Sequence, residues 1–266
     1  MAGSPVANRG RHSPALAAPF LILGFSVFLG SCASFQPAGQ SSYWRPVANP
    51  YPAAATAQPS SPEPSTAGAQ PAPRRATEDP GVVALRAKLV EGAQSIIGSR
   101  ALSIRGRRFT LDCTGTVLAI YWYAGIDLSQ DFGKLKGSGV SRIYQTLQRH
   151  DLLYTTTHPL SGDIIFWDNT YDEDGAEGEP NPLSHMGMVV SVDPGGTISY
   201  VHYHVRRGIT IDHMNLESPN VQSRMENGSL QVINSPLRLA VPGRPHPPRW
   251  LAGQLYRIMG LGYLLE

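Results

Sequence analysis

The sequence predicts an α+β fold in which N-terminal helices pack on an antiparallel β-sheet. Two helical patterns come first in the folded part of the chain, at residues 80–97 and 113–124. Runs of β-forming residues follow at 163–167, 186–192 and 197–205. Helices followed by strands that turn directly back on one another are typical of this fold class.

The first predicted helix begins at Pro80. Asp79 before it can cap the helix, and proline is favoured at the first helical position. Apolar residues then recur at helical spacing through Ile97, and Gly98 follows as a stop signal. This pattern predicts an amphipathic helix packed on the domain.

The second predicted helix runs from Cys113 to Ala124, before Gly125. Its sequence TVLAIYWYA is apolar on every side. A helix of this kind belongs in the interior of a protein. Cys113 would therefore stand at the start of a buried helix.

The last two strands form a predicted hairpin around the turn residues 193–196. If that turn is even, His185 faces His204 and Gly187 faces His202 across the pair. His185 and His202 then become diagonal neighbours on one face, close enough for their side chains to meet. A turn of odd length would break this arrangement.

Residues 1–31 have the features of an export signal. Basic residues precede an apolar run at 15–29, which is too short to span a bilayer with normal flanks. The following LGSC at 29–32 resembles the lipobox of bacterial lipoproteins, which implies cleavage before Cys32 and lipidation of that cysteine. Ordinary cleavage near residues 31–33 and an uncleaved anchor helix are the alternatives.

The composition changes after Cys32. Residues 33–80 hold 10 of the 23 prolines and few charges, a composition that predicts a disordered linker. Together with the lipidated Cys32, this linker forms the predicted segment 32–80. Residues 81–266 carry 17 basic and 17 acidic side chains, so nucleic acid is not an expected partner. Two cysteines in the whole chain exclude a multi-bridge disulfide scaffold and a four-cysteine zinc ribbon.

Cys113 is the candidate nucleophile. A helix N-terminus favours the thiolate and so lowers the pKa of a thiol. A neighbouring histidine pair would supply a base with an orienting partner, as a Cys–His mechanism requires. The alternative is that Cys113 is a small buried core residue.

Four motifs in order resemble the NlpC-type cell-wall peptidases, a papain-like group with a Cys-His-His triad. The resemblance covers roughly residues 82–210 and implies that Cys113 is the nucleophile, His185 the general base and His202 the orienting residue. The motifs are LDCTG (111–115), GDIIFW (162–167), SHMGMVV (184–190) and YVHYHVRRGI (200–209).

The resemblance implies a peptidoglycan hydrolase that cleaves an amide bond in cell-wall stem peptides without a metal or other cofactor. We expect it in the bacterial cell envelope, lipid-anchored at the outer membrane or cell surface. Arg105, Arg107 and Arg108, just before the nucleophile, are candidate contacts for substrate carboxylates.

Two alternatives come from other classes of protein. His202 and His204, with His185 and Asp212 or His213, could form the site of a zinc-binding hydrolase. The second alternative is a non-catalytic wall-binding lipoprotein. It stays open because SIRGRRFT at 103–110 replaces the aromatic-Gly-Gly segment of the NlpC-type peptidases.

Within residues 81–266, the structure of the C-terminal extension is the hardest to predict from the sequence. Its final segment, WLAGQLYRIMGLGYLL, begins at Trp250. The pattern is compatible with a docking helix, a last strand or a partner surface, and docking on the domain is our prediction.

Overall fold

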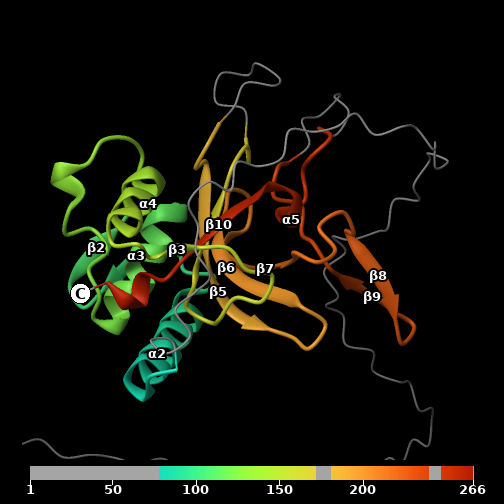
Figure 1. Cartoon of the computed structure of the whole chain (residues 1–266), viewed down its shortest axis with the longest axis horizontal. Helices are drawn as coiled ribbons and strands as arrows, with labels where there is room; N and C mark the ends of the chain where they lie inside the picture. The colour runs from blue at the N-terminus through green and yellow to red at the C-terminus, as the bar shows by residue number, and fades with distance from the viewer. Residues whose placement is uncertain (1–77, 172–180, 240–246, 266) are drawn as a thin grey trace, which may run out of the picture. The chain divides into compact units, whose positions relative to one another are not determined.

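Six antiparallel strands form the main sheet of the protein, which the computed structural model describes over residues 78–171, 181–239 and 247–265 (Figure 1). All described residues fall within one compact unit. The strand order is β3-β10-β4-β5-β6-β7. The strands are β3 (Leu153–Tyr154), β4 (Ile164–Trp167), β5 (His185–Val192), β6 (Thr197–His204), β7 (Gly208–Asn215) and β10 (Tyr256–Gly260).

Three helices gather on one side of this sheet in Figure 1: α2 (Pro80–Ile96), α3 (Cys113–Ala124) and α4 (Gly139–Arg149). The Asp79 carboxylate caps α2 by accepting hydrogen bonds from the backbone N–H groups of its first turn. Gly125, in the left-handed conformation with φ 97°, ends α3. The predicted α+β class and both predicted helices are confirmed.

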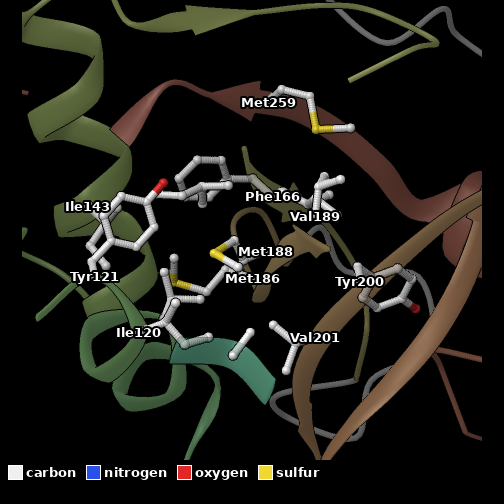
Figure 2. Packing of buried hydrophobic residues seen from close by; sticks show 14 of the residues in the cluster. Ile120, Tyr121, Ile143, Phe166, Met186, Met188, Val189, Tyr200, Val201 and Met259 are labelled. Atoms are coloured by element: carbon white, nitrogen blue, oxygen red, sulfur yellow. The ribbon is translucent and has the colours of Figure 1, made fainter. Parts of the chain in front are cut away.

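Helix α3 lies in the interior, as its apolar sequence predicts. It packs against α2, β5 and β6, and Ile120 and Tyr121 on it have no exposed surface. Figure 2 shows these side chains beside Met186 and Met188 of β5 in the buried cluster. The Tyr121 hydroxyl donates a 2.6 Å hydrogen bond to the carbonyl of Gly162, which ties the helix to the approach of β4.

The β5–β6 hairpin reaches the predicted register by a different route. Near the turn, Val192 pairs with Ile198, so the turn has the odd length that would break the predicted pairing. A β-bulge between Val189 and Ser191 shifts the register by one residue. Beyond the bulge, Met188 pairs with Val201, in the predicted register.

The C-terminal segment completes the main sheet. The short helix α5 (Ala252–Leu255) leads directly into β10, which lies between β3 and β4, and η2 (Gly262–Leu264) follows. The extension therefore supplies both a helix and a strand. It docks on the domain, as predicted, by becoming an interior strand of the sheet.

Two small hairpins and one helical turn make up the other elements. The first hairpin, β1 (Leu102–Ile104) with β2 (Arg107–Phe109), comes immediately before α3. The second joins β8 (Ser223–Glu226) to β9 (Ser229–Val232), and the turn is η1 (Phe132–Lys134).

The predicted signal at 1–31, Cys32 and nearly all of the predicted linker lie outside the described residues. Within the described ranges, no helix is both long enough and apolar enough to cross a membrane.

Candidate active site

Cys113 is the first residue of α3 and the free cysteine of the described chain. The Asp112 side chain before it caps the helix by accepting a 2.7 Å hydrogen bond from the backbone N–H of Gly115. Gly115 has to be a glycine here, because a Cβ at this position would lie 1.9 Å from the carbonyl oxygen of Thr110. The motif around Cys113 thus builds a tight entry into a buried helix.

The surroundings of Cys113 correct one expectation from the sequence. Cys113 is partly buried, and burial together with the nearby Asp112 carboxylate raises the pKa of its thiol above the ordinary value. Hydrogen bonding from the backbone of Met186 and from Thr114 opposes this rise but does not reverse it. The position at a helix N-terminus therefore does not produce a resting thiolate.

The structure brings His185 and His202 together. His185 begins β5 and His202 lies near the end of β6. Nε2 of His185 and Nδ1 of His202 are 2.9 Å apart in a hydrogen bond, as the predicted register requires. Because the Met186 backbone is hydrogen-bonded to Cys113 and α3 packs on β5, the nucleophile candidate lies beside the residue that follows His185.

Asp212 extends this pair into a chain of three residues. Nε2 of His202 and Oδ2 of Asp212 are 2.9 Å apart, and Arg207 donates a 2.6 Å hydrogen bond to the same oxygen. Burial opposes the charged form of Asp212, but its hydrogen bonds to His202 and Arg207 prevail and lower its pKa to about 2. Asp212 is therefore an ionised carboxylate at the end of the chain.

The sequence analysis placed Asp212 only among possible zinc ligands. The strand register shows what signal was available: His202 pairs with Thr210, and Tyr200 pairs with Asp212. These pairs put Asp212 diagonal to His202 on the same face of β6 and β7. The alternation of β6 and β7 across their hairpin therefore predicts that Asp212 lies beside His202.

Aromatic rings surround the two histidines. The Trp167 ring centroid is 5.8 Å from that of His185, and the Tyr200 ring centroid is 5.1 Å from that of His202. Burial and the neighbouring imidazoles lower the pKa of His185 well below its ordinary value. His185 is therefore neutral at neutral pH, the state that a general base requires.

The other two histidines of the zinc alternative have different partners. Nδ1 of His204 accepts hydrogen bonds from the backbone N–H groups of Arg206 (3.1 Å) and Arg207 (3.2 Å), so this side chain stabilises the β6–β7 turn. His213 is paired with Ser199 across the strands, and its ring lies 3.2 Å from the Ser199 hydroxyl. Within the described residues, no group of three or more histidine, cysteine or acidic side chains is arranged to hold a metal ion.

The three candidate arginines do not share one environment. Arg107 forms an ion pair with Asp127 at 3.0 Å, and its guanidinium lies over the Trp122 ring at 4.7 Å, so these contacts hold the β1–β2 hairpin against the domain. Arg105, in the turn with φ 47°, and Arg108 are exposed. A contact between these arginines and substrate stays a prediction.

No family model matches the chain, and comparisons with curated proteins and with solved structures found no match. The resemblance to NlpC-type peptidases therefore rests on the four sequence motifs alone.

Proposed function

We propose that the protein is a papain-like, NlpC-type cysteine peptidase that hydrolyses an amide bond in peptidoglycan stem peptides. One observation carries the proposal: the motif cysteine begins a buried helix packed on the strand that presents His185, and His185 is hydrogen-bonded to His202. The arrangement supplies a nucleophile, a neutral base and a partner that orients the base.

In the proposed reaction, the sulfur of Cys113 attacks the amide carbonyl carbon while His185 takes the thiol proton. His185 then returns that proton to the leaving nitrogen, which forms an acyl-enzyme and a free amine. Water then attacks the thioester carbonyl carbon while His185 takes a proton from it. The carbon–sulfur bond breaks, His185 returns the proton to the sulfur, and the carboxylic acid product is released. The backbone N–H of Cys113, at the first position of α3, has no acceptor within the helix and would stabilise the oxyanion.

The raised pKa of Cys113 and the lowered pKa of His185 determine the resting state of this pair. Both groups are neutral before substrate binds. Proton transfer to His185 would therefore accompany attack by the sulfur, with substrate displacing water from the site.

The N-terminal sequence supports a substrate outside the cytoplasm. A signal over 1–31, lipidation of Cys32 and a 48-residue linker from 33 to 80 would anchor the domain to a membrane of the cell envelope. A flexible coil of that length spans roughly 35–40 Å on average. The domain would then reach a cell wall that lies away from the membrane surface.

The test is digestion of purified peptidoglycan by residues 32–266 carrying Cys32→Ser, with the released fragments identified by mass. Cys113→Ala and His185→Ala should abolish release of stem-peptide fragments, because each removes a reacting group. His213→Ala is the matched control, since this histidine lies outside the chain of hydrogen bonds, and it should retain activity.

Release of the same fragments by the Cys113→Ala variant, or of none by the parent protein, would contradict the peptidase proposal. A chelator separates the proposal from the zinc alternative. The peptidase should keep its activity in chelator and lose it on alkylation of the thiol.

A further inference from the structure

We propose that Asp212, held by Arg207, is a positioning residue that sets the tautomers of His202 and His185. The effect is to leave Nδ1 of His185 unprotonated and ready to accept the thiol proton. This inference rests on the proposed function, because it assigns a role within the same site. It gives a role to a fourth residue, in addition to the cysteine and the two histidines to which the resemblance assigns roles.

Asp212 forms the far end of the His185–His202–Asp212 chain of hydrogen bonds. Oδ2 of Asp212 receives the Arg207 guanidinium at 2.6 Å and faces Nε2 of His202 at 2.9 Å. The Asp212 side chain is only 7% exposed, and an arginine cannot be deprotonated in a protein. An ionised carboxylate only accepts hydrogen bonds, so the hydrogen must be on Nε2 of His202.

The proton positions then follow along the chain. With a single ring hydrogen, on Nε2, His202 has a lone pair on Nδ1. The 2.9 Å hydrogen bond to His185 must therefore be donated by Nε2 of His185. A neutral His185 that carries its hydrogen on Nε2 has a lone pair on Nδ1, and this is the nitrogen left to act as a base.

A hydrogen-bond donor in place of the acceptor at position 212 would reverse the direction of each hydrogen bond along the chain. An amide in place of the Asp212 carboxylate can donate to Nε2 of His202, which moves the hydrogen of that ring to Nδ1. His202 then donates to Nε2 of His185, whose hydrogen moves to Nδ1. The base nitrogen is occupied, although the side chains keep their positions and their hydrogen-bond distances.

Arg207 opposes this reversal. Its guanidinium has no acceptor atom, so it favours a carboxylate oxygen at Asp212 over any donor. The Arg207 side chain is 43% exposed whereas His202 is 1% exposed. The partly exposed Arg207 therefore supplies the positive charge that keeps the buried Asp212 an acceptor.

The double variant Asp212→Asn with Arg207→Met tests the inference. The amide keeps the shape of the aspartate side chain, and removing the guanidinium removes the donor that would hold an oxygen toward His202. Long-range proton–nitrogen NMR on ¹⁵N-labelled residues 32–266 with Cys32→Ser reports the histidine tautomers directly at neutral pH. We expect the Nε2–H form for His185 and His202 in the parent protein and the Nδ1–H form for both in the variant. Peptidoglycan digestion by the variant should fall about 100-fold or more in kcat/KM.

Glu226→Gln with Arg224→Met is the matched control, because it makes the same pair of changes at another arginine–carboxylate pair, in strand β8 of the β8–β9 hairpin and outside the site. It should leave the tautomers and the activity unchanged. The inference is overturned if the parent protein carries the His185 hydrogen on Nδ1, or if the double variant keeps the parental tautomers.

The NMR result does not depend on activity. The expected tautomers in a protein that digests no peptidoglycan would overturn the proposed function and leave the positional role of Asp212 standing. Parental activity in the double variant with reversed tautomers would overturn the mechanistic role of Asp212 and leave the peptidase proposal intact.

Discussion

Cys113 and His185 illustrate how burial acts in opposite directions on an acid and a base. Removing the thiol from water raises its pKa, and removing the imidazole from water lowers its pKa. Both shifts favour the uncharged form of each residue. The pair is therefore stored as a neutral thiol and a neutral imidazole rather than as an ion pair.

This neutral resting state predicts the pH dependence of thiol alkylation. Because the pKa of Cys113 lies above its ordinary value near 9, the thiolate fraction is small at pH 7 and grows as the pH rises through 9 and beyond. Iodoacetamide should modify Cys113 slowly at pH 6–7 and progressively faster at pH 9–10, measured by mass spectrometry on the Cys32→Ser protein. A rate already maximal at pH 6 would show a thiolate–imidazolium pair instead.

The sequence was informative about which side chains meet and uninformative about their charge states. Strand alternation combined with an even turn predicted that His185 and His202 meet. In the structure the turn is odd, and a β-bulge restores the predicted register. The pKa of Cys113 was predicted in the wrong direction, since its burial depends on how β5 packs over the start of α3. Arg107 looked available to a substrate because its partners, Asp127 and Trp122, come later in the chain.

Among the elements, the β5–β6 hairpin shows how a register can be predicted while its construction is not. The turn after Val192 is odd, and the bulge between Val189 and Ser191 compensates for it. A bulge leaves no clear mark in the sequence, because the extra residue resembles its neighbours. The two irregularities together return the histidines to one face.

Gly187 is the position at which this hairpin is most sensitive to substitution. A Cβ there would lie 2.7 Å from the carbonyl oxygen of Val201 and 3.2 Å from Cβ of His202. Gly187→Ala should therefore force β5 and β6 apart, lower the free energy of unfolding by about 1–3 kcal/mol and reduce peptidoglycan digestion. Urea unfolding and the digestion assay measure the two effects.

Gly133→Ala provides the comparison for that variant. Nothing lies within 4 Å of a Cβ at Gly133, so the free energy of unfolding should change by less than about 0.5 kcal/mol. Equal stability changes in the Gly133 and Gly187 variants would show that the close approach of β5 to β6 does not constrain the hairpin.

For the molecule as a whole, the C-terminal strand is the feature least accessible from sequence. β10 pairs with β3 and β4, which lie roughly 100 residues earlier in the chain. Its residues Ile258 and Met259 resemble those of any buried strand, and nothing local specifies the two partners. The last segment could be predicted to dock on the domain, but its position inside the sheet depends on pairings between distant parts of the chain.

A buried carboxylate links this C-terminal segment to the rest of the sheet. Asp163, just before β4, accepts hydrogen bonds from the hydroxyl of Tyr154, on β3, and from the hydroxyl of Tyr263, in η2, at 2.8 Å. The backbone N–H of Leu160 donates a further bond at 2.7 Å. Burial outweighs these hydrogen bonds and raises the pKa of Asp163 to about 6.

The stability of the whole domain should therefore depend on pH through Asp163. Because the folded-state pKa lies above the ordinary value of 3.8, its contribution is fully present below pH 3.8 and is lost as the pH rises through 6. The loss is about 3 kcal/mol by linkage.

Asp163→Asn keeps an acceptor for the tyrosines without the charge. Its stability relative to the parent should therefore rise by about that amount between pH 3.5 and pH 7, measured by urea unfolding. Asp193→Asn, in an exposed turn, should follow the parent at both pH values, and a constant difference between the Asp163 variant and the parent would contradict the linkage.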